Sequence, residues 1–217
     1  MTHIHAVIFD VDGTLVDSND AQARSWVDAL KEFGYSVPHE KVRPLIGMGG
    51  DKVLPETIGV QKDSEKGKQI SKRRSEIFKE KYLPNVKPFP DAQKLLDRMR
   101  KQGLKLAIAT SAQPDELRPL LQIVGAAVLI EDKTTARESS KPDPDVMQVA
   151  LKRVGYPPNE VVMIGDTPYD IEAARKVGVE TIAFRCGGWS DSDLAGAIAI
   201  YNDPADLLAH YDSSPLA

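Results

Sequence analysis

The first residues in the chain whose types and spacing could do chemistry are two aspartates, Asp10 and Asp12. They follow the apolar segment of residues 6–9 and precede Gly13, whose missing side chain permits a tight turn. Four apolar residues are too few for a helix and are typical of a buried parallel strand. Ligands bind at the carboxyl ends of such strands, so the two carboxylates are candidate functional groups.

Two other interpretations of this stretch are open. In the first, Asp10 and Asp12 belong to an ordinary Asx–Gly turn and bond only local backbone amides. In the second, the pattern begins a calcium loop, which requires a liganding glutamate at its twelfth position. Counted from Asp10, that position is Ala21, which excludes the calcium loop. The plain turn is disfavoured because matching polar residues recur at three later strand ends or loops.

Those later residues are a hydroxyl pair, a lysine and two further carboxylates. In chain order they are Thr110 and Ser111 after a strand, Lys141 at a helix start, and Asp166 and Asp170 after a strand. Each has a commoner explanation by itself, namely a turn-capping hydroxyl, a surface lysine and a helix cap. Together they predict three or four carboxylates at one sheet edge, which would repel one another without a cation. Oxygen ligands without nearby histidine or cysteine favour Mg²⁺.

The elements that must position these residues alternate between strands and helices from residue 86 onward. The predicted strands are 104–109, 127–130, 161–164, 181–184 and 197–201, and a polar loop is predicted for 131–140. Amphipathic helices lie between them, and most end at a glycine. This alternation predicts right-handed βαβ crossovers and a mostly parallel sheet in an α/β fold.

Residues 18–85 form a different kind of segment. No convincing strand occurs there, and apolar residues at helical spacing predict helices, the longest from 64 to 82. We therefore expect a small all-helical domain of residues 18–85 inserted into an α/β core domain of residues 1–17 plus 86–217. The glycine-rich break at 47–50 is interpreted as a phosphate cradle or as a mobile loop over an active site.

The long helix of this insertion is basic. Between residues 62 and 81 there are eight Lys or Arg against four Asp or Glu. Such a run is typical of a solvated helix face, and the alternative is an electropositive wall that attracts an anionic substrate.

Composition narrows the class of protein further. The 217 residues are 41% hydrophobic and 28% charged, which is typical of a soluble globular protein, and the net charge of −4 argues against nucleic-acid binding. The single cysteine, Cys186, cannot form an internal disulfide and is interpreted as a packing residue. Neither a signal peptide nor an apolar run of membrane length is recognisable. We expect a cytoplasmic protein without membrane association and without an evident obligate protein partner.

Taken as a set, the motifs resemble those of the haloacid dehalogenase superfamily of phosphohydrolases, specifically its members with a small helical cap. The resemblance covers nearly the whole chain. It rests on four motifs, which are Asp10-Val11-Asp12-Gly13-Thr14, Ile108-Ala109-Thr110-Ser111, Lys141-Pro142-Asp143-Pro144-Asp145 and Gly165-Asp166-Thr167-Pro168-Tyr169-Asp170. It implies a Rossmann-like sheet whose first and fourth motif strands are neighbours, with residues 18–85 as the cap.

The resemblance also implies the chemical roles of these residues. Asp10 is expected to be the nucleophile that forms an aspartyl-phosphate. Asp12 is expected to protonate the leaving oxygen and then to help activate the hydrolytic water. The Thr110 hydroxyl and the Ser111 amide are expected to hold phosphate oxygens, and Lys141 to neutralise charge on the phosphate and the nucleophile.

A magnesium ion is the cofactor that the resemblance implies. Its expected ligands are Asp10, the backbone carbonyl of Asp12, and Asp166. Asp170 is expected to act through water or by orienting Lys141. Together with positioning of the phosphate, this set is sufficient in kind for phosphoryl transfer.

The implied activity is Mg²⁺-dependent hydrolysis of a phosphomonoester of a small metabolite, and phosphoglycolate phosphatase is the nearest named activity. Dehalogenation is disfavoured because the members that remove halide lack an acid at the position of Asp12. A phosphonatase would need a Schiff-base lysine in the cap, and the surroundings of Lys52 do not resemble that motif.

Two further alternatives remain. A β-phosphoglucomutase-like isomerase has the same core and cap class, but that group usually carries Glu-Asp where this chain has Gly165-Asp166. A catalytically idle binding module is disfavoured because no motif residue is missing. The substrate itself is not readable, since the segments expected to supply specificity, residues 43–51 and the long helix, match no recognisable pattern.

Overall fold

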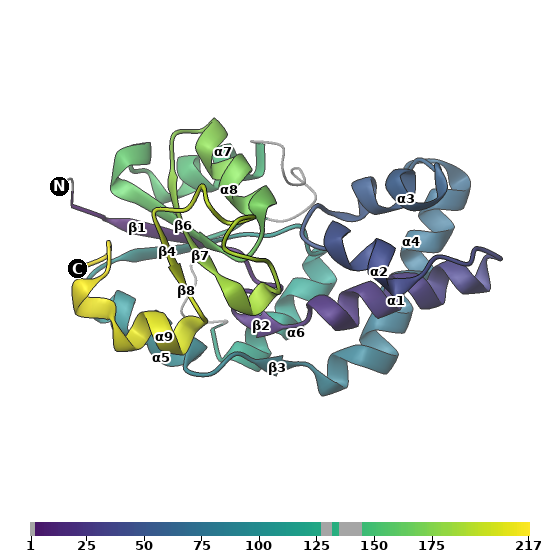
Figure 1. The fold of residues 1–217 in the computed structure, drawn as a ribbon, viewed down its shortest axis with the longest axis horizontal. Coiled ribbons are helices and arrows are strands. Elements are labelled where there is room, and N and C mark those ends of the chain that lie inside the picture. The colour runs from purple at the N-terminus through teal and green to yellow at the C-terminus, as the bar shows by residue number, and fades with distance from the viewer. Residues whose placement is uncertain (1–2, 127–131, 135–144) are drawn as a thin grey trace. The chain divides into compact units, whose positions relative to one another are not determined.

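In the computed structural model, the chain divides into two compact units, and each is described separately (Figure 1). The larger comprises Met1–Asp17 with Lys87–Ala217, and the smaller comprises Ser18–Val86. The structure describes residues 3–126, 132–134 and 145–217. Within the described part, no helix is both long enough and apolar enough to cross a membrane.

The larger unit is built on a sheet whose pairings are all parallel in the described part of the chain. Its strands run in the order β5-β4-β1-β6-β7-β8. Their bounds are β1 Ala6–Phe9, β4 Lys105–Ala109, β5 Asp132–Thr134, β6 Val161–Gly165, β7 Glu180–Phe184 and β8 Ala199–Tyr201. The predicted α/β fold with a mostly parallel sheet is therefore confirmed.

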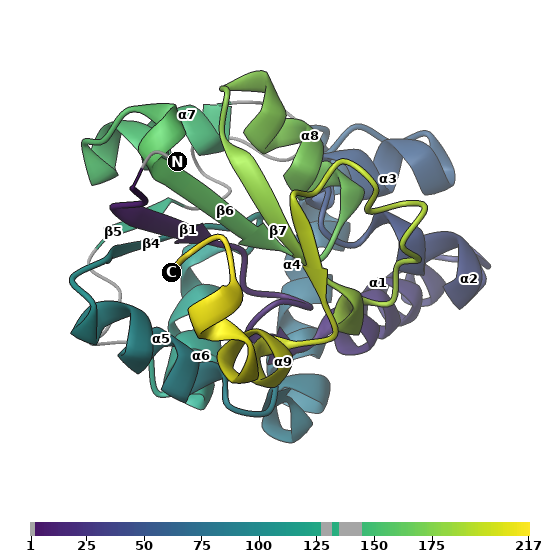
Figure 2. The same cartoon turned by 60° about the vertical axis from the view of Figure 1, so that its left-hand side comes forward.

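Five α-helices cover the two faces of this sheet within the described residues. They are α5 Ala92–Lys101, α6 Pro114–Val124, α7 Asp145–Val154, α8 Pro168–Lys176 and α9 Pro204–Ala209. Figure 2 shows α7 and α8 over one face, and α5, α6 and α9 over the other. Because both faces are covered, all four residues of β1 are buried, which explains its uninterrupted apolar sequence.

One edge of this sheet differs from the sequence prediction. The predicted strand at 127–130 lies outside the described residues. Strand β5 at Asp132–Thr134 falls inside the segment predicted as a polar loop, so that prediction is wrong at these three residues. They pair in parallel with residues 107–109 of β4 at the edge of the sheet. An edge strand can be short and polar, so it lacks the apolar run by which a central strand is recognised.

A second, two-stranded sheet was also missed. It pairs β2 (Val16–Asp17) antiparallel with β3 (Lys87–Pro88), next to the points where the chain leaves and re-enters the larger unit. The sequence suggested only connectors there, because two residues are too few to show a periodic pattern.

The smaller unit, Ser18–Val86, is helical throughout its regular elements, all of which the structure describes. They are α1 Asn19–Glu32, α2 His39–Val42, the 3₁₀ turn η1 Arg43–Leu45, α3 Gly50–Ile58, α4 Glu65–Ile77, the π-helical turn η2 Phe78–Tyr82 and the 3₁₀ turn η3 Leu83–Asn85. Its hydrophobic core joins Trp26 and Leu30 of α1 to Ile70 and Ile77 of α4.

Candidate active site

Asp10 and Asp166 stand directly after neighbouring strands. The Asp10 amide donates to the carbonyl oxygen of Ile164 at 2.9 Å, so the pairing of β1 with β6 continues to the aspartate. Asp10 is 2% exposed, and Asp166 and Asp170 are fully buried. Carboxylate oxygens of these three residues lie within 4.8 Å of one another. The structure therefore brings together three of the four predicted carboxylates.

The loop after β1 presents the fourth carboxylate. Gly13 has a φ of +78°, a conformation that glycine adopts without strain. Its amide donates to the carbonyl oxygen of Val16 at 2.8 Å, which closes a tight turn. Asp12, in this loop, is 8% exposed and is not one of the three clustered carboxylates. Its side chain therefore lies outside the clustered set.

A site residue that the sequence reasoning did not single out is Thr14. Its Oγ1 donates to Oδ1 of Asp166 at 2.8 Å, and both residues are fully buried. The hydroxyl therefore fixes one oxygen of a carboxylate 152 positions away in the chain. A threonine directly after Asp-x-Asp-Gly was part of the recognised motif, but nothing local indicated the partner of its hydroxyl.

Asp170 caps helix α8 while it contributes to the acidic cluster. Its Oδ2 accepts hydrogen bonds from the Thr167 amide at 3.0 Å and from Thr167 Oγ1 at 2.7 Å. The Asp170 amide in turn bonds Thr167 Oγ1, which completes a capping box. These bonds fix the Asp166–Asp170 loop. Asp170 therefore caps the helix, as its commoner interpretation predicted, and also belongs to the acidic cluster.

Gly165 makes room for Asp170. A Cβ at position 165 would lie 2.5 Å from Cγ and 2.6 Å from Oδ2 of Asp170, well inside contact distance. The glycine that precedes Asp166 is thus required by the packing of the second aspartate.

Thr110 follows β4, which neighbours β1 on the side opposite β6. Its side chain is fully buried, and its Oγ1 accepts a hydrogen bond from the Ala112 amide at 3.1 Å. This is the turn-capping contact that such a hydroxyl makes by default. Ser111 is next to it and only partly buried. The remaining predicted residue, Lys141, lies outside the described residues.

Cys186 lies beside the site as a neutral thiol. Burial, followed by the charge of Asp166, raises its pKa far above the usual value. Its Sγ donates to the carbonyl oxygen of Gly13 at 3.3 Å. A thiol that is this hard to ionise is a poor nucleophile.

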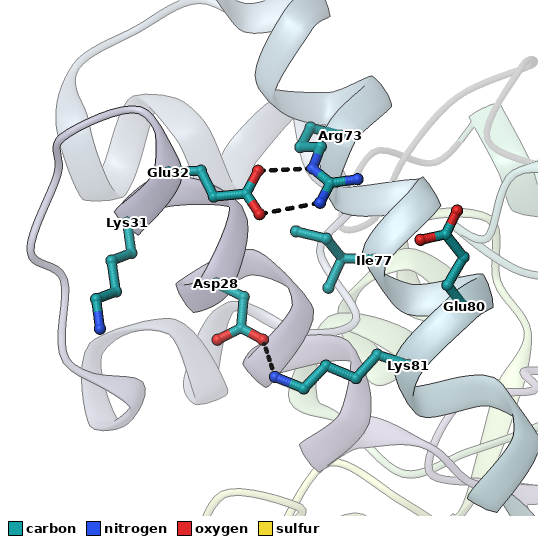
Figure 3. Close-up of a pocket in the computed structure, with 7 residues that line it drawn as sticks. All are labelled: Asp28, Lys31, Glu32, Arg73, Ile77, Glu80 and Lys81. Atoms are coloured by element: carbon teal, nitrogen blue, oxygen red, sulfur yellow. Dashed lines mark hydrogen bonds and ion pairs between the residues drawn. The ribbon is translucent and has the colours of Figure 1, made fainter.

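The smaller unit carries a separate groove of about 540 Å³, shown in Figure 3. On one side Arg73 bonds both carboxylate oxygens of Glu32, at 2.6 and 3.0 Å. On the other, Lys81 Nζ donates to Asp28 at 2.6 Å, and Ile77 lies between the two pairs. These two cations are paired with acidic residues of α1, which favours a solvated, ion-paired face over an unpaired positive wall at this place.

Comparison with known proteins identifies the family. The model of the haloacid dehalogenase-like hydrolases matches residues 7–184. A phosphoglycolate phosphatase from Aquifex aeolicus is 31% identical over 82% of this chain and 83% of its own length. The pyrophosphatase PpaX from Bacillus velezensis is 29% identical over 82% of each chain. The crystal structure of a hydrolase from Pseudomonas syringae superimposes with a TM-score of 0.88 at 29% identity, covering 96% of this chain and 98% of that one. The chain therefore belongs to the haloacid dehalogenase-like hydrolases.

Proposed function

We propose that this protein is a Mg²⁺-dependent phosphatase that hydrolyses a phosphomonoester of a small metabolite through an aspartyl-phosphate on Asp10. The observation that carries the proposal is the buried cluster of Asp10, Asp166 and Asp170 at the carboxyl ends of β1 and β6. Such a cluster is costly without a partner, because buried like charges disfavour one another's ionised forms. The relatives named as phosphatases support the same reaction class.

The donor set of this cluster fits a magnesium ion. Three carboxylates supply oxygen atoms within 4.8 Å of one another, and Mg²⁺ prefers a few such oxygens together with water and substrate phosphate. Asp10 and Asp166 would hold the ion through their carboxylates, and Asp12 through its backbone carbonyl. When bound, the ion would neutralise the negative charge that otherwise keeps an anionic phosphate away from a carboxylate nucleophile.

Phosphoryl transfer then needs a nucleophile and an acid on the same loop. A carboxylate oxygen of Asp10 forms a bond to phosphorus while the bond from phosphorus to the ester oxygen breaks. The Asp12 carboxyl donates its proton to that leaving oxygen, which departs as an alcohol. In the second half, the Asp12 carboxylate takes a proton from water as the water oxygen bonds to phosphorus. The bond between phosphorus and the Asp10 oxygen breaks, which releases inorganic phosphate and restores the Asp10 carboxylate.

Three further groups would hold the phosphate during this exchange. The Thr110 hydroxyl and the Ser111 amide follow β4, the neighbour of β1, so they leave the sheet at the same edge as Asp10. Lys141 would supply a positive charge to the same phosphate oxygens. Fixed donors of this kind stabilise the charge that develops in the transition state without having to reorganise.

The helical unit, Ser18–Val86, would act as the cap that selects the substrate. The break between α2 and α3 contains two glycines in left-handed conformations, Gly47 at φ +102° and Gly49 at φ +105°. A loop whose path depends on such residues suits the part of the cap that meets the substrate. The substrate is proposed to be a small phosphorylated metabolite, with 2-phosphoglycolate as the first candidate.

The alternative of a phosphoglucomutase-like isomerase is weakened by the packing at Gly165. The mutase group usually has glutamate at this position, yet a Cβ there would lie within 2.6 Å of the Asp170 side chain. Glutamate could be accommodated only if Asp170 moved away from its cap. A phosphatase that carries Gly-Asp needs no such rearrangement.

The test is phosphate release from a panel containing 2-phosphoglycolate, other sugar and acid phosphates, and pyrophosphate, with Mg²⁺ or with EDTA. The Asp10→Asn variant, purified identically, is the blank. Release that requires Mg²⁺ and disappears in the variant supports the proposal and ranks the substrates. If pyrophosphate alone is cleaved, the monoester assignment is wrong.

If the folded protein releases no phosphate from any compound, the phosphatase proposal fails. Incubation with glucose 1-phosphate then distinguishes the two remaining hypotheses, a mutase and an idle binding module. Glucose 6-phosphate with little free phosphate would identify a mutase, and no conversion at all would leave the idle binding module as the surviving hypothesis.

A further inference from the structure

The turn that follows β7 lies beside the acidic cluster although it belongs to none of the recognised motifs. It is the 3₁₀ turn η5, Arg185–Gly187, and it begins directly after Phe184. Strand β7 pairs in parallel with β6, and Ala183 is level with Gly165. The turn therefore leaves the sheet at the same edge as the loop that carries Asp166.

Gly187 and Asp166 approach so closely that no other residue fits at position 187. A Cβ there would lie 1.9 Å from Oδ2, 2.4 Å from Cβ and 2.5 Å from Cγ of Asp166. Gly187 does not have a positive φ, so the need for glycine arises from space and not from backbone conformation. Any side chain at this position would push the Asp166 carboxylate out of its place.

The opposite oxygen of the same carboxylate is held by a hydrogen bond. Thr14 Oγ1 donates to Oδ1 of Asp166, while Oδ2 is the oxygen nearest to the missing side chain of Gly187. The orientation of Asp166 is thus determined from two sides, by a donor on the loop after β1 and by the backbone of η5.

Cys186 connects the turn to the loop after β1. Its Sγ donates to the carbonyl oxygen of Gly13, one residue beyond the Asp12 carbonyl that we assign to the metal.

The turn is itself anchored to the rest of the larger unit. Arg185 bonds both carboxylate oxygens of Asp191, at 2.6 and 2.9 Å, and reaches Asn202 Oδ1 at 3.1 Å. The Cys186 amide donates to the carbonyl oxygen of Asn202 at 2.9 Å. The turn can therefore serve as a fixed surface against which the two acidic loops are placed.

We propose that η5 is a positioning element for cation binding, in which Gly187 sets the orientation of the Asp166 carboxylate and Cys186 holds the loop of Asp12 and Gly13. This inference rests on the proposed function, because it assigns the acidic cluster to a divalent cation. Residues that orient metal ligands affect affinity even though they do not touch the metal.

The test measures Mg²⁺ affinity without turnover. The unfolding midpoint temperature is recorded against Mg²⁺ concentration, since a ligand that binds only the folded state raises it by mass action. Gly187→Ala should bind Mg²⁺ about tenfold or more weakly than the wild-type protein. The matched control is Gly196→Ala, where the nearest contact of the added Cβ is Ile171 and not an acidic residue. It should bind Mg²⁺ with wild-type affinity.

A second pair of variants keeps the inference testable if Gly187→Ala does not fold. Cys186→Ala removes the donor to Gly13, and we expect Mg²⁺ affinity to fall about threefold. Cys186→Ser keeps a donor at the same position and should recover most of that loss. In both variants, the concentration of Mg²⁺ that gives half-maximal turnover should change in parallel with the affinity measured by unfolding.

The outcomes separate this inference from the proposed function. A wild-type protein that is not stabilised by Mg²⁺ at any concentration contradicts the metal site itself, and this inference with it. A wild-type protein that binds Mg²⁺, with a folded Gly187→Ala variant of unchanged affinity, overturns only the role of Gly187. Equal affinities for Cys186→Ala and the wild-type protein overturn the role of the thiol.

Discussion

The larger unit gathers Asp10, Asp166 and Asp170 in a buried cluster, whereas the smaller unit carries Asp28 and Glu32 along a solvent-accessible side of α1. In the cluster, the carboxylate oxygens lie within 4.8 Å of one another. On α1, each carboxylate has its own cation at 2.6 Å. The first arrangement brings like charges together in a buried place, whereas in the second each carboxylate is paired with a basic side chain.

The same contrast appears in the basic groups of the smaller unit. Arg73 and Lys81 pair with α1 at the surface, but Arg74 is buried between the rings of Trp26 and Phe78, 5.4 and 5.3 Å from their centroids. Its Nε donates to Ser25 Oγ at 3.1 Å. Exposed ion pairs contribute little to stability, whereas buried charges are costly to disturb. Burial, more than the number of charges, therefore determines how much a charged side chain affects stability.

The largest effect is expected from Asp10→Asn. It removes the proposed nucleophile from the buried cluster and should lower kcat by about a thousandfold or more, because the covalent step would be lost. Steady-state phosphate release measures it. Asp28→Asn on the exposed face of α1 is the matched control and should retain wild-type kcat. Comparable losses in both variants would remove the distinction between the two acidic regions.

The next effect is on cation binding. Asp166→Asn should reduce the Mg²⁺ dependence of the unfolding midpoint, with affinity weakened more than about tenfold. Glu32→Gln removes a carboxylate that already has a partner, Arg73, and should leave the Mg²⁺ response unchanged. A calorimetric titration of both variants gives the affinities directly. An unchanged affinity in Asp166→Asn would contradict the assignment of the cluster to the metal.

The third effect is on turnover, and it tests whether the backbone conformation of the smaller unit affects catalysis. Proline cannot adopt the φ of +105° at Gly49, so Gly49→Pro must change the path of the loop before α3. We expect kcat/KM to fall by about a hundredfold, since misplacement of a substrate-positioning loop is costly. Gly34→Pro, at another glycine of positive φ in the same unit, controls for the general cost of proline in this unit. Unchanged kinetics in Gly49→Pro would remove this loop from the mechanism.

The fourth effect is on stability alone. Arg74→Met keeps a long apolar chain but loses the cation between two rings and the bond to Ser25, at a cost of about 2 kcal/mol in the free energy of unfolding. Urea unfolding measures it, and Arg73→Met at the surface should cost less. The reverse order would contradict the view that burial decides the contribution of a charge.

The smallest expected effect is a pH dependence of the free energy of unfolding, caused by the Asp28 carboxylate of the smaller unit. Burial opposes the shift, but hydrogen bonds from Lys81 and Tyr82 lower the pKa of the Asp28 carboxyl below its ordinary value. A lowered pKa stabilises the folded state above the unfolded pKa of about 3.9, and that contribution is lost as the pH falls through the folded value.

The variant that tests this is Lys81→Met. Its deficit in unfolding free energy should be present at neutral pH, vanish in acid as Asp28 is protonated, and shrink at high salt. Urea unfolding between pH 3 and pH 7 gives the profile. Lys31→Met removes a charge that lowers the same pKa without a hydrogen bond, and it should show a smaller deficit of the same form. A deficit that is constant across this range would exclude the ion pair as its source.

Much of the fold was accessible from local patterns. The apolar run before Asp10 predicted β1, and the run before Gly165 predicted β6. Both are central strands, whose buried faces leave a strong pattern in the sequence. Strand β5 was predicted as part of a loop and the pair β2–β3 was missed, because edge and two-residue strands leave almost no pattern.

For the candidate site, the sequence by itself determined which residue types follow each central strand. It also determined the order of the motifs, by which the chain resembles its family. Only the tertiary structure decided which distant residues contact the Asp166 carboxylate. The order β4-β1-β6-β7 makes Asp10 and Asp166 neighbours, as the resemblance implied, and also brings η5 to the same edge, which nothing in the sequence indicated. The hydroxyl of Thr14 and the bare backbone of Gly187 then orient Asp166. Local sequence reports periodicity and turn chemistry, whereas contacts between distant segments depend on how the strands are ordered and packed, which no local pattern encodes.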